Sequence, residues 1–160
     1  EPTGVIASGG QNVNHLNEAY GGQTPDIWDN AYVVFDFANG ARAMLDLCMF
    51  AEGSRHSAEL AAIGEKAKVE CLLPQNIVTH GNRENWEVAQ DHIHVPEEIL
   101  NAGYHSGATY HQNKAFLDAV RGAAEVPVTA LDGHRAVAMG VAAQMAAAEK
   151  RRVDMTEVGL

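Results

Sequence analysis

Apolar and polar positions follow a two-residue period through the first part of the chain, and a helical period takes over later. The strongest strand signal lies at residues 30–50, where two runs rich in β-branched and aromatic residues flank Asn39-Gly40. Asn and Gly tolerate positive φ, so this pair predicts a two-residue hairpin turn with Phe37 opposite Arg42. Both faces of that hairpin are mostly apolar, and we therefore expect cover on both sides.

Shorter apolar runs before and after the hairpin predict further strands, joined by polar turns. A tight turn is expected at 64–66 and an irregular segment at 10–24. The result is a mainly antiparallel meander. The expected strands are 4–9, 56–63, 67–72, 76–80, 85–89 and 92–95.

A first helix is predicted after residue 109. Thr109 and Gln112 have the spacing of a capping box, and Gly122 provides a stop signal. The residues expected on its apolar face are Phe116, Leu117 and Val120.

A second, longer helix follows. Thr129 and Asp132 predict its start and Lys150 its approximate end, and residues 153–155 are expected to return as an edge strand. Alanines beside the apolar stripe would allow close approach to a neighbour. The stripe itself is formed by Leu131, Val137, Val141, Met145 and Ala148.

Strands first and helices last predict an α+β fold, with an open, mainly antiparallel β-sheet and helices packed on one face. Two helices can cover one face of such a sheet, and no chain remains to cover the other. We therefore expect the second apolar face to dock against a second copy or another domain and so to serve oligomerisation.

Composition limits the possible classes of binding partner and suggests the cellular compartment. The net charge is −10 and basic residues are scattered, which argues against nucleic acid or an anionic membrane surface as partner. No apolar run approaches the roughly 20 residues of a membrane span. Cys48 and Cys71 lie in strand-like runs and are expected to be buried free thiols in a reducing compartment, the cytoplasm. The first residues, Glu1-Pro2, suggest a fragment or a processed product.

Common catalytic and cofactor motifs are absent from the sequence, including Gly-X-Gly-X-X-Gly, His-Glu-X-X-His and Cys-X-X-Cys. His92 and His94 could chelate a metal from one strand face, as in a small metal-dependent hydrolase, but no fixed spacing supplies a third ligand. The expected hairpin register places Asp36 and Asp46 on opposite faces, so they would not form a paired-carboxylate site.

One polar-aromatic cluster could line a cleft, because it precedes and opens the first predicted helix. Its histidines could exchange protons near neutral pH, and its tyrosines could donate to a substrate oxygen. The alternative is tyrosines packed under the sheet beside solvated histidines. Trp28 could likewise anchor the strand entry or form a cleft wall. The cluster consists of Tyr104, His105, Tyr110 and His111.

Several short motifs occur in a set order: Phe37 to Ala41, Gly64-Glu65-Lys66, Tyr104 before a helix with Phe116, Pro127 to Gly133, Ala142-Ala143, and Arg152-Val153. This order resembles the C-terminal domain of the glucose–fructose oxidoreductase, inositol dehydrogenase and rhizopine-catabolism oxidoreductase family (Gfo/Idh/MocA). The resemblance covers about Gly4 to Val153. The family's turn usually reads Gly-X-X-Gly, whereas Ala67 stands at its last position here.

The resemblance implies a two-domain enzyme whose N-terminal Rossmann domain binds NAD or NADP. Residues 1–160 would be the C-terminal substrate and oligomerisation domain, without the Rossmann domain. The implied reaction is hydride transfer between the nicotinamide and a carbinol carbon of a sugar, cyclitol or related polyol.

The family's catalytic Lys and His motifs are not in this sequence, so no catalytic, cofactor-binding or metal residue is assigned. The resemblance implies that this fragment alone is inactive, binds no cofactor and forms a homo-oligomer through the sheet face. It also places Trp28 and the Tyr/His cluster as substrate-cleft candidates. The alternative function is a free-standing oligomeric module that binds a small polar ligand.

Overall fold

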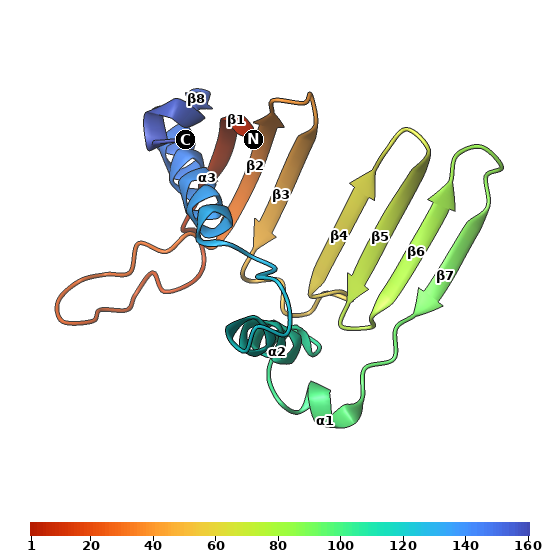
Figure 1. Cartoon of the computed structure of the whole chain (residues 1–160). Helices are drawn as coiled ribbons and strands as arrows, with labels where there is room; N and C mark the ends of the chain where they lie inside the picture. Colours follow the sequence, from red (N-terminus) through yellow and green to blue (C-terminus); the bar gives the residue numbers. More distant parts are fainter. The chain divides into compact units, whose positions relative to one another are not determined.

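The computed structural model describes residues 1–160, and the chain divides into two compact units. Unit 1 contains residues 1–51 and 128–160, and unit 2 contains residues 52–127. Each unit has one open, four-stranded antiparallel sheet (Figure 1). The α+β class is therefore confirmed, although the strands form two sheets rather than one. No helix of the chain is long and apolar enough to cross a membrane.

Unit 1 is built from both ends of the chain. Its sheet has the strand order β3-β2-β1-β8, and β8 pairs with β1 as the predicted edge strand. A 3₁₀ helix, η1, follows β8 and adds the buried Met155 to the core. The elements are β1 (Pro2–Gly10), β2 (Asn30–Phe37), β3 (Arg42–Cys48), α3 (Ala130–Glu149), β8 (Val153–Asp154) and η1 (Met155–Val158).

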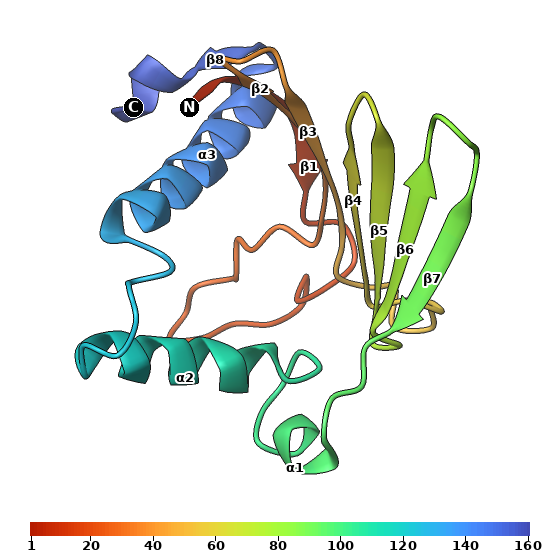
Figure 2. The ribbon, with the colours of Figure 1, turned by 45° about the vertical axis from the view of Figure 1, so that its right-hand side comes forward.

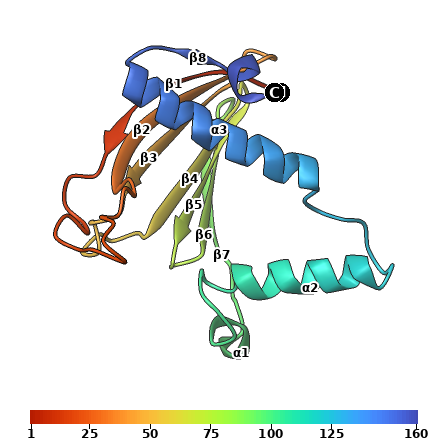
Figure 3. The ribbon, with the colours of Figure 1, turned by 90° about the vertical axis from the view of Figure 1, so that its left-hand side faces the viewer.

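Helix α3 lies along one face of this sheet (Figures 2 and 3). As predicted, Thr129 and Asp132 form its capping box, and Lys150 ends it in a left-handed conformation. The core between helix and sheet consists of Val5, Ala31, Val33, Phe35, Ala138, Ala142, Ala143, Ala146, Val153 and Met155.

The predicted buried stripe of α3 is wrong. Leu131, Val137 and Val141 are exposed, and the helix instead presents four buried alanines to the sheet. Hydrophobicity alone favours burial of the larger side chains. Methyl groups allow closer approach between helix and sheet, and that approach decides which face is buried. Met145, which was expected in the stripe, is half-buried against the core.

The hairpin turn differs from its prediction by one residue. The Gly40 N–H donates to the Phe37 carbonyl at 2.9 Å, and the Phe37 N–H donates to the Ala41 carbonyl at 3.0 Å. Gly40 has a φ of 82°, whereas Asn39 has no positive φ. This is a three-residue loop in which the glycine forms a bulge, rather than a two-residue turn.

The loop length changes which side chains share a face. Asp36 now pairs with Arg42, and Tyr32 pairs with Asp46, so the two aspartates lie on the same face rather than on opposite ones. That face is the one without α3, because the alternate residues of β2 are in the core. Its exposed apolar side chains are Ile6, Tyr32, Val34 and Met44.

Unit 2 contains a β4-β5-β6-β7 meander and two helices, α1 and α2 (Figure 1). The predicted turn at 64–66 joins β4 and β5, whereas the two strands expected at 85–89 and 92–95 are one strand, β7. Gly107 is the only buried residue of this unit. The elements are β4 (Ala58–Ile63), β5 (Ala67–Leu73), β6 (Ile77–Asn82), β7 (Val88–His92), α1 (Glu97–Leu100) and α2 (Ala108–Val120).

Helix α2 begins differently from its prediction. Gly107 is its N-cap, with a φ of 91°, and no side chain caps it. The Thr109 hydroxyl instead donates to the Tyr104 carbonyl at 3.1 Å. The expected apolar face of Phe116, Leu117 and Val120 exists but is exposed.

Candidate functional site

Asp29 organises the long segment between β1 and β2. It is fully buried, and its carboxylate accepts main-chain hydrogen bonds from Val13 and Asn14, both at 2.7 Å, and from Asn12 at 3.0 Å. The Asn30 side-chain amide donates to the same carboxylate at 2.8 Å. These contacts tie residues 12–14 to the start of β2.

The protonation state of Asp29 follows from this surrounding. Burial alone raises the pKa of its carboxyl, because the charged form loses its water. The hydrogen bonds from Asn14, Val13, Asn12 and Asn30 outweigh burial and hold the pKa well below its ordinary value. The group is therefore an anion that serves the structure, with no role as a proton donor near neutral pH.

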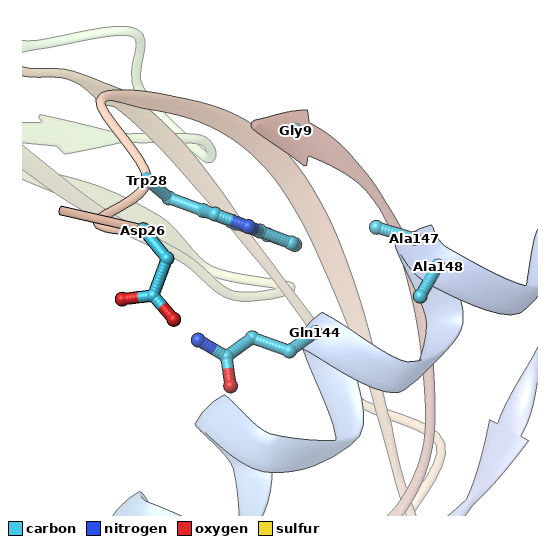
Figure 4. A pocket seen from close by; sticks show the side chains of 6 residues that line it. All are labelled: Gly9, Asp26, Trp28, Gln144, Ala147 and Ala148. Carbon is cyan, nitrogen blue, oxygen red and sulfur yellow. The ribbon is translucent and has the colours of Figure 1, made fainter. Parts of the chain in front are cut away.

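Trp28 precedes this anchor and is half-buried against the core of unit 1. It lines an open pocket of 370 Å³ beside the carboxyl-terminal half of α3 (Figure 4). Both sequence alternatives for Trp28 therefore hold in part, since the side chain packs on the core and also forms a pocket wall. The other lining residues are Gly9, Asp26, Gln144, Ala147 and Ala148.

The four residues of the Tyr/His cluster lie in unit 2, around the start of α2. The main chain before the helix is unusual, because His105, Ser106 and Gly107 have φ values of 64°, 54° and 91°. Positive φ is uncommon for residues other than glycine, and such conformations gather at functional sites. His105 is therefore held in a costly conformation next to Tyr104.

Gly107 is required by space as well as by conformation. A Cβ atom at this position would lie 3.1 Å from side-chain carbons of both Val95 and Ile99. The tight approach of those residues fixes the turn that carries the cluster.

The members of the Tyr/His cluster differ in their contacts and in their exposure. The Tyr110 and His111 rings meet edge to face, with centroids 5.4 Å apart. Tyr104 is 83% exposed, so it does not pack under a sheet. The structure thus brings Tyr110 and His111 into contact, whereas Trp28 belongs to the other unit.

The histidines and the two sheets bear on possible metal and dinucleotide sites. His92 ends β7 and His94 follows it, and no three His, Cys, Asp or Glu side chains are grouped to hold one ion. In Rossmann folds, dinucleotides bind at the carboxyl ends of parallel strands, whereas both sheets here are antiparallel. Neither sheet therefore has the strand edge of a Rossmann-type dinucleotide site.

Sequence reasoning missed the partners of Trp28. Asp26 lies two residues before it and could have been grouped with it, but Gln144 comes from a helix more than a hundred residues away. No local pattern predicts that approach. The role of Asp29 was also missed, although an aspartate just before a strand is a residue that often binds nearby main-chain N–H groups.

Comparison with known proteins shows a match to one protein family. Residues 3–155 match the family described as "Oxidoreductase family, C-terminal alpha/beta domain". No curated protein matches the chain.

Two solved structures illustrate the similarity. One is an oxidoreductase from Agrobacterium radiobacter in complex with NAD+, L-tartaric acid and magnesium, with 16% identity and a TM-score of 0.72. The other is levoglucosan dehydrogenase in complex with NADH and levoglucosan, with 17% identity and a TM-score of 0.73. The alignments cover 98% and 96% of this chain, but only 44% and 45% of the solved chains.

At this level of identity the solved structures show a shared fold. This chain spans less than half of their length. The family match is broader evidence, because it includes nearly every element of both units. The chain belongs to the Gfo/Idh/MocA oxidoreductase family, as its C-terminal α/β domain.

Proposed function

We propose that this chain is the substrate-side and oligomerisation domain of an NAD(P)-dependent oxidoreductase that acts on a sugar, cyclitol or related polyol. The observation that carries the proposal is the family match over residues 3–155. It is supported by two similar structures, one of which contains NAD+ with L-tartaric acid and the other NADH with levoglucosan.

The nicotinamide and the proton-transferring side chains come, in this proposal, from a Rossmann domain outside these 160 residues. Two antiparallel sheets without a dinucleotide fingerprint suit a domain that leaves cofactor binding to another. The exposed apolar face of α2, formed by Phe116, Leu117 and Val120, suits a helix that is covered by further protein.

The substrate-facing residues are proposed to be Trp28, Tyr104, His105, Tyr110 and His111. Trp28 lines a pocket, and the Tyr/His cluster stands on and beside a turn with a strained main chain. Tyrosine and histidine can donate to or accept from substrate hydroxyls, which suits positioning of a polyol rather than hydride transfer itself.

Oligomerisation is proposed through the sheet face of unit 1 that lacks α3. Ile6, Val34 and Met44 are cross-strand neighbours on this face and are all exposed. Adjacent apolar side chains in one row favour association with a second copy. The cytoplasm is the proposed compartment, because Cys48 and Cys71 are both free. The expected burial of these thiols is wrong, since Cys48 is exposed and Cys71 is half-buried.

The test combines the parent reading frame with a binding titration. An upstream Gly-X-Gly-X-X-Gly and Glu-Lys-Pro in the same frame would support the enzyme, and NADH should not bind the purified 160-residue chain. Micromolar NADH binding to this chain, or a start codon immediately before Glu1, would contradict the proposal. A start codon there would favour the alternative, an oligomeric small-ligand-binding module.

A further inference from the structure

The loop between β2 and β3 contains the only asparagine of the chain that is followed by glycine. Asn39 and Gly40 are both exposed, and neither belongs to a strand or a helix. An asparagine side chain can react with the peptide nitrogen of the next residue, and a glycine there has no Cβ atom to hinder the approach. Asn39 is therefore the asparagine of this chain that is most open to such a reaction.

The Asn39 side chain is folded forward over the peptide bond with which it would react. Its Oδ1 atom accepts a hydrogen bond from the Ala41 N–H at 3.1 Å. The ring that this hydrogen bond closes contains both the amide carbon of Asn39 and the peptide nitrogen of Gly40, so it holds the two atoms near each other. Holding two reacting atoms together raises the rate of their reaction.

The same hydrogen bond stabilises the charge that develops in the reaction. When the Gly40 nitrogen attacks the Asn39 amide carbon, negative charge collects on Oδ1. The Ala41 N–H already donates to that atom, as the main-chain donors of an oxyanion hole do. One main-chain donor is thus in place before the reaction starts.

One contact opposes the reaction. The Gly40 N–H donates to the Phe37 carbonyl at 2.9 Å, and this proton must leave before the nitrogen can attack. The hydrogen bond lies in an exposed loop, and Val33 and Phe35 keep the hairpin in the core of unit 1 when the loop opens. The contact therefore slows the attack without preventing it.

We propose that Asn39 is a self-modifying site, at which the chain converts its own asparagine to aspartate and isoaspartate through a cyclic imide. The Gly40 nitrogen loses its proton to solvent base and bonds to the Asn39 amide carbon, and the amide nitrogen takes up a proton and leaves as ammonia. Water then adds to either carbonyl of the ring, and the carbon–nitrogen bond of that carbonyl breaks. No oxidant, cofactor or second chain takes part.

The products change the charge of the loop and, in part, its length. Both carry a carboxylate near Arg42, which pairs with Asp36 at the base of the loop. Isoaspartate also routes the main chain through the former side chain, which adds one atom to a three-residue loop. Modification should therefore lower the stability of the hairpin formed by β2 and β3.

Two other asparagines are matched controls within the same molecule. Asn82 and Asn85 are also exposed, and each accepts a hydrogen bond from the N–H two residues later, at 2.8 and 3.2 Å. The residues that follow them are Arg83 and Trp86, whose side chains hinder approach to the peptide nitrogen. Faster conversion at Asn39 than at both controls would therefore report on the glycine rather than on exposure.

The experiment incubates the purified 160-residue chain for several weeks in mildly alkaline buffer. The chain is then digested, and mass spectrometry with chromatography separates the asparaginyl, aspartyl and isoaspartyl peptides. Conversion at Asn39 should be at least about tenfold faster than at Asn82 and Asn85. It should accelerate with pH, because the attacking nitrogen must lose its proton. Asn39→Ser has no amide to react, so its unfolding midpoint should stay constant while that of the parent falls.

A second variant tests the hydrogen bond to Oδ1. Ala41→Pro removes the donor N–H and should slow conversion at Asn39 by roughly tenfold in the folded chain. The parent and this variant should convert at equal rates when both are unfolded in guanidinium chloride, because the hydrogen bond is then absent. A difference seen only in the folded chains assigns the effect to the contact.

Three results would overturn the assignment. They are conversion at Asn39 no faster than at the two controls, aspartate without isoaspartate, and equal rates for the folded parent and Ala41→Pro. The second would indicate direct hydrolysis by water rather than attack by the Gly40 nitrogen. None of these results depends on a nicotinamide or on a further domain, so the proposed oxidoreductase function stands or fails separately.

Discussion

The Oδ2 atom of Asp29 lies 2.7 Å from the main-chain nitrogen of Val13. The two residues are joined by a segment that leaves β1 and returns to β2, and this contact closes it. Removing the carboxylate would leave several main-chain donors without partners, together with the space that the side chain occupies. The segment that carries Trp28 therefore depends on one buried anion.

Asp29→Ala should lower the thermal unfolding midpoint by roughly 5 °C or more, because the N–H groups of residues 12–14 lose their acceptor. Glu125→Ala, at an exposed position outside the proposed oligomerisation face, should change it little. Differential scanning fluorimetry gives both values. Equal midpoints for the two variants would show that the Asp29 contacts do not hold the segment.

The same contacts predict an acid dependence of stability. Because the folded pKa of Asp29 lies below its unfolded value of about 3.9, its contribution is fully present above that value. The contribution is lost as the pH falls through the lower folded pKa. Stability measured by urea unfolding should therefore decline below about pH 4.

Glu157 adds to this trend, because the Arg151 guanidinium lowers the pKa of that carboxyl to about 2. Asp29→Asn should be less stable than the parent near neutral pH, and its stability should change less between pH 4 and pH 2. If Asp29→Asn retains the full acid dependence, other carboxyl groups are responsible for it.

The buried alanine face of α3 predicts that larger side chains are not tolerated at these positions. Ala142 is fully buried between helix and sheet, so Ala142→Leu should destabilise unit 1 by about 1–3 kcal/mol. Ala136→Leu is the matched control, because Ala136 is exposed on the same helix. It should change the free energy of unfolding by no more than about 0.5 kcal/mol. Chemical denaturation of the two variants makes the comparison.

Gly9 in β1 also has no room for a larger side chain. A Cβ atom there would lie 2.7 Å from both the Asn30 carbonyl oxygen and the Ala31 Cβ, so Gly9→Ala requires main-chain movement and should destabilise the chain. At Gly4 the added Cβ meets only the Arg152 guanidinium, which can move aside. Gly4→Ala should therefore have the smaller effect in the same unfolding assay, and the reverse order would argue against the close approach of β1 and β2.

Unit 2 should be the less protected part of the isolated chain. Its sheet has no buried residue, whereas β1, β2 and α3 share a core. Hydrogen exchange followed by mass spectrometry should therefore be faster in β4–β7 than in β1 and β2. Equal protection of both sheets would mean that the faces of unit 2 are covered, for example by association of two chains.

Much of the fold was predictable from local signals. The Thr129 capping box and the turn after β4 each depend on neighbours within a few residues, and both are confirmed. The edge strand β8 is confirmed as well, although its partner β1 lies at the other end of the chain. The hairpin was found, but its register was not. Asn39-Gly40 is compatible with both a two-residue turn and a three-residue loop with a glycine bulge, and strand twist and packing choose between them.

The candidate site was less predictable, because tertiary contacts make it. Trp28 could be selected from sequence as an aromatic residue beside a strand, whereas its approach to Gln144 exists only after α3 packs on the sheet. The buried face of α3 was mistaken for the same reason, since close packing favours Ala142 over Val141. The strain at His105 gave no sequence signal, because nothing in its residue type requires positive φ.

The pairing of Val5 with Val153 has a consequence for chain length. It joins the two ends of the chain, so all of unit 2 is an excursion that begins and ends at unit 1. The entropy of closing such an excursion grows only with the logarithm of its length, and doubling it costs about 0.6 kcal/mol. Insertions and deletions between Ala51 and Val128 should therefore leave unit 1 almost as stable as before. This part of the chain is free to vary in length without loss of the shared core.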